Sequence, residues 1–569
     1  MSGGARFTAA RGRQSIRTCS MTPRDLIPRA PDNMPVCLAW AAGVVTLLFL
    51  FQRFRYAPDF TDETFSIAMP YRYALGDKPF VDEISIQQTA GFLLFPFVWL
   101  WVKINGSTGL VLFVRVLHFL VFKGAAAAGV WFAARRVLAT HSAAIATAFV
   151  PLAFVPHSIP NVGYNVIGLA FLIAGSFFVV AAIYDLSDKL ALRLSFTGGI
   201  LMSLMSFAYP PMAVAALTTA PLLLACAPRR RFHVTGAFIA GGVAGVLLVS
   251  PGLLFGGVSG VKRSLAWGAQ AGSMHGRERL KAMLDAFWLG MPREFVYVGI
   301  GLVAAGLSRL KPLAPIAVLA SILTVLWWYR DDPSYSPATS RTVIYLGALA
   351  PAFVFVAQPD RQLVRASALV IVPAFAAAAA AAVFSTQNLD AAALGLISAV
   401  VFIVLLGGRA MERAGTGATF ALVPAFIALF FYVDRAWISV YRDAPLAALT
   451  ETVPQGPFKG LRTTKDRVEM LGELRDIVRR FDQPDGHILV LYEQPGFYLA
   501  SKMPPSAHSV WEASYGDIDG MIDFFQTKAN GKGIVLKVRG MPTTRADIVL
   551  TPLDRKIYET RHFLVYRDQ

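Results

Sequence analysis

The 569-residue sequence contains few cysteines and few charged residues for its length. Cysteine occurs three times, at Cys19, Cys37 and Cys226, and no two of these form a CxxC pair. Their spacing gives no indication of a disulfide framework or a zinc site. Charged residues make up only 16% of the chain, whereas hydrophobic residues make up 55%. This composition excludes an ordinary soluble protein and predicts that the lipid bilayer is the solvent of most of the chain.

Acidic residues are especially scarce, with 36 Asp and Glu against 53 Lys and Arg and a net charge of +17. The basic residues are scattered between apolar runs, as in the cytoplasmic loops of membrane proteins, so we expect no nucleic-acid partner. Acidic residues are almost absent from the apolar runs themselves. That absence argues against a secondary transporter or lipid flippase, which usually places ionisable groups at mid-membrane.

Long apolar runs are abundant, and a 19-residue window predicts about thirteen membrane spans. They lie at 34–52, 108–133, 140–157, 163–183, 194–208, 211–227, 233–255, 293–308, 312–329, 342–357, 363–384, 390–407 and 418–434. The first run follows an arginine-rich segment and has no small-residue cleavage site after it, so we expect a retained span rather than a signal peptide. Residues 1–33 are then a basic cytoplasmic tail and residues 34–434 a transmembrane module.

A further apolar stretch at 84–102 decides the topology, because it could cross the membrane or lie along its surface. If it lies at the surface, every short basic turn faces the cytoplasm, as the excess of Lys and Arg on that side requires. These turns are 135–136, 189–193, 229–231, 309–311, 361–365 and 409–413. We therefore expect a surface helix at 84–102, with the loops at 52–88, 256–293 and 330–341 outside the cell.

The polar segment 435–569 then also lies outside. Strands are indicated at 487–492, 533–538, 546–550 and 561–566, and helices at 464–481 and 518–528. This alternation predicts a small α/β domain. The expected fold is therefore an all-α polytopic membrane bundle with a C-terminal extracytoplasmic α/β domain.

The first outer loop, within residues 53–88, carries the most informative pattern. An acidic pair, Asp62 and Glu63, directly follows the first span, and Gly76 to Phe80 forms a G-x-x-P-F turn before the predicted surface helix. These features resemble the GT-C superfamily of polyprenyl-phosphate-sugar-dependent glycosyltransferases, which includes protein O-mannosyltransferases and the aminoarabinose transferases that modify lipid A. The thirteen predicted spans and the outward C-terminal domain are similar to the layout of those two families.

The resemblance implies that an acceptor hydroxyl attacks the anomeric carbon of the sugar while a lipid phosphate leaves. The leaving phosphate needs no general acid, so one carboxylate suffices as a base. The family pattern favours Asp62 as this base, with Glu63 orienting it or helping to bind the acceptor. Asp82 and Glu83 are the alternative pair. Carboxylates that merely solvate an exposed loop are the competing interpretation of all four residues.

Cations would stabilise the charge that develops on the departing phosphate. The candidates are basic residues in the outer loops, where topology disfavours them: Arg341, Lys262, Arg263, Lys78 and Arg72. Contact with lipid headgroups is the competing interpretation. Tyr329, Arg330 and Tyr335 could add donors, although the aromatic residues there are also typical of an interfacial belt.

No metal or cofactor is predicted. His157 and His275 lack any partner at metal-ligand spacing, and a divalent metal at Asp62 is left as an alternative that the superfamily at large allows. The expected partners are a polyprenyl-phosphate-linked sugar, a cell-envelope acceptor and membrane lipids.

The sequence thus predicts an inverting glycosyltransferase of the bacterial inner membrane. It would move a sugar from a polyprenyl-phosphate donor to an extracytoplasmic glycan, lipid or protein. Two other functions stay open at this point. One is a secondary transporter or lipid flippase, and the other is a non-catalytic cell-envelope scaffold.

Overall fold

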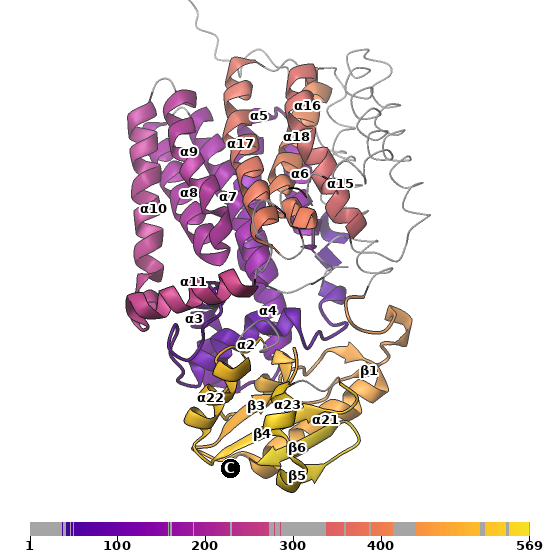
Figure 1. Ribbon diagram of the computed structural model, residues 1–569. Coiled ribbons are helices and arrows are strands. Elements are labelled where there is room, and N and C mark those ends of the chain that lie inside the picture. The colour runs from indigo at the N-terminus through magenta and orange to yellow at the C-terminus, as the bar shows by residue number, and fades with distance from the viewer. Residues whose placement is uncertain are drawn as a thin grey trace, which may run out of the picture.

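The computed structural model contains a helical bundle and a C-terminal α/β domain, with the first outer loop between them (Figure 1). It describes residues 51–271, 337–413 and 440–567, except for gaps at 157–158, 160–161, 186, 228–229, 358–359, 386–387, 512–517 and 542–544, and a few isolated residues at 37–48 and 278–285. All structural statements below concern these residues.

The helices of the loop and bundle follow one another with short connections. Their bounds are α2 Asp62–Ala74, α3 Gln88–Asn105, α4 Leu110–Leu117, the π-helix η1 His118–Lys123, α5 Gly124–Val137, α6 His141–Ala153, α7 Tyr164–Tyr184, α8 Asp188–Ala208, η3 Pro210–Met212, α9 Ala213–Cys226, α10 Arg231–Leu254, α11 Gly257–Ala271, α15 Pro337–Ala348, α16 Ala350–Ala357, α17 Arg361–Phe384, η4 Asn388–Ala392 and α18 Ala393–Arg413.

Six helices in the described residues are long and apolar enough to cross a membrane. They are Leu110–Val137, Tyr164–Tyr184, Asp188–Ala208, Arg231–Leu254, Arg361–Phe384 and Asp390–Ala410. The chain is thus a membrane protein. The runs predicted at 293–308, 312–329 and 418–434 lie outside the described residues, as does most of 34–52, so the count of thirteen stays a prediction.

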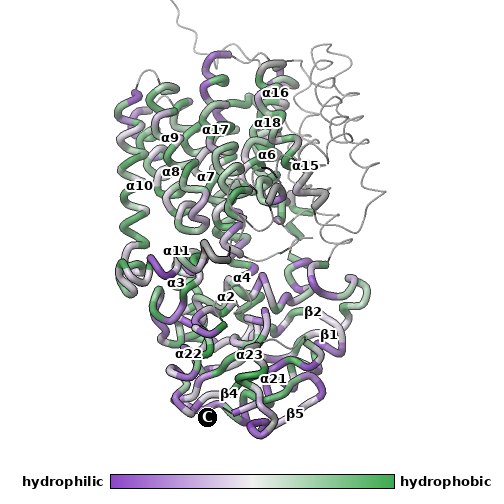
Figure 2. Tube along the Cα trace, viewed as in Figure 1, coloured by the Kyte–Doolittle hydropathy of each residue, from purple (hydrophilic) through white to green (hydrophobic). Residues whose placement is uncertain are grey.

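The stretch predicted to lie along the membrane forms α3, which is not among these six helices. Figure 1 shows α3 beneath the bundle, near α11, which runs across the foot of α10. Trp99, Leu100 and Ile104 of α3 are exposed apolar residues. Their exposure fits a helix that contacts lipid, and the tube coloured by hydropathy is largely green along the bundle and mixed in the C-terminal domain (Figure 2).

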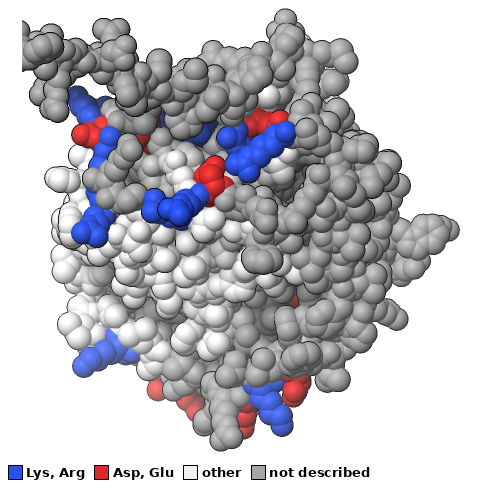
Figure 3. Space-filling model, turned by 90° about the horizontal axis from the view of Figure 1, so that it is seen from above, with Lys and Arg blue, Asp and Glu red and all other residues white. Residues whose placement is uncertain are grey.

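The opposite end of the bundle holds a network of charged helix ends. Arg136 of α5 pairs with Asp185 at 2.5 Å, and Arg413 of α18 pairs with Asp360 at 3.3 Å. Glu412 accepts from the backbone amide of Thr140 at 2.8 Å. Lys and Arg side chains gather around this end of the molecule (Figure 3). The basic turns at 135–136, 230–231, 361–365 and 409–413 therefore lie together, at the end away from the C-terminal domain, whereas the turn at 309–311 lies outside the described residues.

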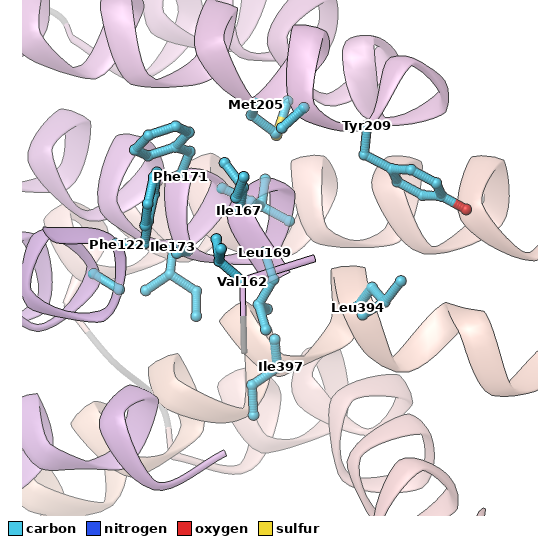
Figure 4. Close-up of a cluster of buried hydrophobic side chains, with 14 of the residues drawn as sticks. Phe122, Val162, Ile167, Leu169, Phe171, Ile173, Met205, Tyr209, Leu394 and Ile397 are labelled. Atoms are coloured by element: carbon cyan, nitrogen blue, oxygen red, sulfur yellow. The ribbon is translucent and has the colours of Figure 1, made fainter. Parts of the chain in front are cut away.

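The span Leu110–Val137 contains the π-helix η1 in its interior. Lys123, at the end of η1, is buried and donates to the carbonyl of Pro151 at 3.0 Å and to that of Phe154. These carbonyls lie where α6 ends, at Ala153. A buried ammonium thereby satisfies backbone acceptors that a broken helix leaves unpaired in a membrane. Phe122 of η1 packs on Phe171 of α7 in the apolar core of the bundle (Figure 4).

Glycines allow α8 and α10 to approach closely. A Cβ atom on Gly199 would lie 2.0 Å from the carbonyl oxygen of Phe238, whereas one on Gly236 would meet nothing within 4 Å. Small residues at such contacts let the backbones of membrane helices pack together.

We expect Gly199→Ala to lower the free energy of unfolding by about 1–3 kcal/mol, the usual cost of overpacking. The matched control, Gly236→Ala, should be neutral or stabilising by up to about 1 kcal/mol, because alanine favours helix. Thermal unfolding in detergent measures both, and equal melting temperatures for the two variants would contradict the close contact.

The C-terminal domain is built on a four-stranded mixed sheet in the order β3-β4-β6-β5. β3 and β4 pair in parallel, while β6 is antiparallel to both β4 and β5. The elements are η6 Leu446–Ala448, β1 Glu451–Thr452, β2 Arg462–Thr463, α21 Lys465–Phe481, β3 His487–Val490, η7 Pro495–Ala500, α22 Ile518–Ala529, β4 Gly533–Val538, α23 Arg545–Leu550, η9 Leu553–Arg555, β5 Lys556–Glu559 and β6 Phe563–Arg567.

One predicted strand of this domain is wrong. Residues 546–550 belong to the helix α23, and the strand of the four-stranded sheet that is missing from the prediction is β5. A short apolar run does not distinguish a strand from a helix by periodicity alone. Both edges of β4 are already paired, with β3 and β6, so the sheet offers this run no place beside β4.

Candidate active site

The acidic pair lies at the first turn of α2, where the first outer loop meets the C-terminal domain. Asp62 and Glu63 are the first two residues of the helix, and negative charge is favourable there because of the helix dipole. The two side chains differ in exposure, because Asp62 is 30% exposed and Glu63 is fully buried. Only Asp62 is therefore accessible to a substrate.

Asp59 organises the start of α2 from the preceding loop. Its Oδ1 accepts from the backbone amide and the hydroxyl of Thr61, at 3.0 and 2.6 Å, and its Oδ2 accepts from the amide of Glu63 at 2.8 Å. Burial raises the pKa of Asp59 from 3.8 to about 6, although these hydrogen bonds oppose the shift. Asp59 is 3% exposed, so its role is to shape the loop.

The raised pKa predicts a pH dependence of stability. Because the folded protein holds a proton on Asp59 at pH values where the unfolded chain has lost it, the contribution of this residue to stability falls as pH rises from about 4 to about 6. A rise of the Asp59 pKa from 3.8 to about 6 corresponds to about 3 kcal/mol of stability. We expect the difference in unfolding free energy between the parent and Asp59→Asn to change by this order over that interval. Parallel stability curves for the two proteins would contradict the prediction.

Glu63 forms a bidentate ion pair with Arg115 of α4. Nε and one terminal nitrogen of Arg115 donate to the two carboxylate oxygens at 2.5 and 2.6 Å. Its remaining donors contact the carbonyls of Phe54, Tyr56 and Ala57 at 2.6–2.8 Å. All five guanidinium donors are thus used, and the pair fixes α2 to the N-terminal end of the first described span, Leu110–Val137.

Two residues near the start of the C-terminal domain contact Asp62. The hydroxyl of Tyr441 donates to Asp62 Oδ2, and the guanidinium of Arg442 lies 3.4 Å from the same oxygen. Arg442 also donates to the hydroxyl of Thr61 at 2.5 Å. Burial and the neighbouring Asp62 raise the pKa of Tyr441, so its hydroxyl stays protonated as a donor.

The two oxygens of Asp62 are used differently. Tyr441 and Arg442 both contact Oδ2, and Oδ1 has no hydrogen-bond partner among the described residues. A partly exposed carboxylate with one oxygen held and the other unengaged can accept a proton from a hydroxyl that approaches it.

The other acidic residues of the loop lie at the far end of α2. Arg72 is fully buried, pairs with Asp77 at 2.5 Å and Glu83 at 3.2 Å, and donates to two carbonyls of the C-terminal domain. Asp82 accepts from the ammonium of Lys528 at 3.0 Å and from the amide of Lys78 at 2.7 Å. Burial raises the pKa of Asp82, but these two donors outweigh it and hold the pKa below its usual value.

The structure therefore separates the residues proposed for catalysis. A 13-residue helix such as α2 is about 20 Å long, with Asp62 at its start and Asp82 beyond its end. Asp82 and Glu83 are engaged by Lys528 and Arg72, which join the loop to the C-terminal domain.

Four of the predicted phosphate-binding cations, Lys78, Arg72, Lys262 and Arg263, also lie away from Asp62. Lys78 is exposed in the turn after α2, and Lys262 and Arg263 are exposed on α11, where Arg263 donates to the carbonyl of Phe80 at 3.3 Å. Arg72 is already bound to carboxylates and carbonyls. Arg341 lies in α15, but its side chain is outside the described part of the structure, as are His157, His275, Tyr329, Arg330 and Tyr335. Their proposed roles stay predictions.

The first outer loop and the C-terminal domain form one packed unit. The Tyr71 hydroxyl donates to the carbonyl of Ser501 at 2.8 Å, and the amide of Val510 donates to Glu83 at 3.0 Å. Near Asp62, Phe65 packs edge-on against Trp511 with ring centroids 5.0 Å apart. The C-terminal domain thus holds both ends of α2.

Three residues at the site were not anticipated from the sequence: Arg115, Tyr441 and Arg442. Arg115 carries a recognisable signal, since an arginine within an apolar span requires a partner. Tyr441 and Arg442 follow the last predicted span and look like ordinary interfacial residues. In the described residues no group of three or more His, Cys, Asp or Glu side chains could hold a metal ion, and the expectation that no metal is needed stays a prediction.

No protein-family model and no curated protein matches the chain. The chain is, however, similar to several solved structures. One similar structure is the oligosaccharyltransferase of Archaeoglobus fulgidus with a tethered acceptor peptide, at 12% identity and a TM-score of 0.47, covering 88% of this chain and 69% of that one. Another is ArnT of Cupriavidus metallidurans bound to undecaprenyl phosphate, at 13% identity and a TM-score of 0.43, covering 94% and 98%. The archaeal enzyme was also solved with a dolichol-phosphate.

Proposed function

We propose that this chain is a membrane-embedded inverting glycosyltransferase that takes a sugar from a polyprenyl-phosphate donor. The observation that carries the proposal is Asp62, a partly exposed carboxylate at the junction of the helical bundle and the C-terminal domain, with one oxygen held and the other unengaged. The resemblance of the first outer loop to GT-C glycosyltransferases supports the same assignment.

In this reaction Asp62 acts as the general base. Its Oδ1 takes the proton of an acceptor hydroxyl, the hydroxyl oxygen forms a bond to the anomeric carbon, and the bond from that carbon to the phosphate oxygen breaks. The electron pair leaves with the polyprenyl phosphate, which is stable as an anion and needs no proton. Attack from the face opposite the phosphate inverts the anomeric configuration.

The proposed orientation follows from the distribution of charge. The basic helix ends gather at the end of the bundle away from the C-terminal domain, and Lys and Arg favour the cytoplasmic side. Asp62 and the C-terminal domain would then face the extracytoplasmic side, where the acceptor is a glycan, lipid or protein of the cell envelope.

The assay is to incubate purified protein in lipid with radiolabelled polyprenyl-phosphate sugars and a membrane extract as acceptor. We expect label to enter the acceptor in step with release of free polyprenyl phosphate. A polyprenyl-diphosphate sugar tests the donor class, because transfer from it alone would indicate a glycan ligase. Neither transfer nor binding with any donor would reject the proposal.

A transporter is the second candidate, and the buried His118 and Lys123 inside a membrane span favour it. Lys123, however, donates to two backbone carbonyls at the end of α6, which accounts for its charge structurally. Uptake of a labelled polyprenyl-phosphate sugar into vesicles without transfer would support this second function.

A further inference from the structure

The turn at residues 440–443, near the start of the C-terminal domain, contacts the start of α2. It brings Tyr441 and Arg442 onto the same oxygen of Asp62, and it ties Arg442 to Thr61, the residue before α2. We propose that Tyr441 and Arg442 are positioning residues that hold Asp62 ready to act as the base. This inference rests on the proposed function and adds two residues that neither the acidic motif nor the charge pattern indicated.

The backbone of the turn supports a functional role. Arg442 has a φ of 50°, in the left-handed region that non-glycine residues seldom adopt. Such a conformation persists only where the surroundings enforce it, and it is concentrated at functional sites. Contacts elsewhere in the domain must therefore hold the turn in this conformation.

Two residues of the C-terminal domain supply that support. Arg467 of α21 donates to the carbonyl of Arg442 at 2.5 Å and lies 3.3 Å from Asp443. The hydroxyl of Thr463 donates to the other oxygen of Asp443 at 3.0 Å. Arg467 also donates to the carbonyl of Pro58 at 3.0 Å, so it fixes the turn and the loop before α2 to each other.

The geometry assigns Arg442 to the base rather than to the leaving phosphate. In an inverting displacement the base and the leaving group act on opposite faces of the sugar, and in inverting glycosidases the two catalytic carboxyl groups are about 6.5–9.5 Å apart. A guanidinium 3.4 Å from Asp62 Oδ2 lies on the base side. The two contacts on Oδ2 leave Oδ1 for the acceptor hydroxyl.

Steady-state kinetics of Arg442→Gln and Tyr441→Phe test the inference. We expect kcat to fall by about 10- to 100-fold, because loss of alignment at a reacting group has costs of this order. The donor KM should change by less than about twofold, since neither residue contacts the donor phosphate. Arg442→Lys should recover part of the loss because it restores the charge.

Matched controls are Arg475→Gln and Tyr558→Phe, which alter exposed or half-buried side chains of the same domain far from Asp62. Both should transfer at the parental rate. Thermal unfolding of every variant separates misfolding from misalignment, and Tyr441→Phe, which removes a single hydroxyl, keeps the test valid if Arg442→Gln unfolds.

The results distinguish the inference from the proposed function. Parental kcat in both Tyr441→Phe and Arg442→Gln, or a raised donor KM at unchanged kcat, would overturn the positioning role. Full transfer by Asp62→Asn would instead overturn the proposed function on which it rests.

Discussion

Replacing Asp62 by asparagine is expected to lower kcat for sugar transfer by about 10²- to 10⁴-fold, the usual contribution of a general base. Asparagine keeps the shape of the side chain but cannot accept the proton of the acceptor hydroxyl. Because the leaving phosphate needs no group on Asp62, donor binding should be retained. Single-turnover transfer and equilibrium binding of a labelled donor measure the two effects separately.

Two further variants make this result specific. Asp476→Asn alters an exposed carboxylate of α21 and should transfer at the parental rate. Asp82→Asn tests the alternative base at the far end of α2. Loss of transfer in Asp82→Asn together with parental transfer in Asp62→Asn would move the chemistry about 20 Å along α2, and would contradict the assignment of Asp62.

Replacing Arg115 by methionine is expected to destabilise the fold by about 3–5 kcal/mol, because breaking a buried ion pair leaves one charge uncompensated. The uncompensated group is Glu63, and the carbonyls of Phe54, Tyr56 and Ala57 lose their donor as well. Chemical unfolding in detergent measures the loss. Transfer by the surviving folded protein should also fall, since the start of α2 is no longer fixed.

A second substitution separates loss of the pair from loss of packing. Removing the charge of Glu63 in Arg115→Met/Glu63→Gln should restore part of the lost stability, because no ionised group then stays buried. Arg475→Met, on the exposed surface of α21, is the matched control and should be nearly neutral. A small effect of Arg115→Met alone would show that Glu63 finds another partner.

Much of the bundle could be predicted from the sequence, because lipid leaves a long apolar run few alternatives to a helix. The runs at 163–183 and 363–384 correspond to α7 and α17 within two residues at each end. The basic helix ends lie together because successive spans cross in opposite directions, which puts alternate connections at the same end of the bundle. The run at 342–357 is instead divided into α15 and α16, because a hydropathy window records composition and not where a helix breaks.

The candidate site was only partly predictable, for reasons that differ between residues. Asp62 and Glu63 are adjacent in the chain, and no pattern in the sequence indicates that Asp62 is partly exposed while Glu63 is buried against Arg115. Tyr441 lies 379 residues after Asp62 in the chain, and Arg442 follows it directly. They reach Asp62 because the C-terminal domain packs against the first outer loop. The hydrophobic periodicity of a sequence does not predict such packing between distant segments.

The contacts of Arg72 also set an order for biogenesis. Its acceptors in the C-terminal domain, the carbonyls of Pro505 and Ala507, come 433 and 435 residues later in the chain. At about 5–20 residues per second, the outer loop waits about 20–90 s before those partners are synthesised. During that interval Arg72 has only carboxylates of its own loop. A ribosome that stops before residue 505 therefore leaves a membrane-inserted protein whose outer loop cannot complete its fold.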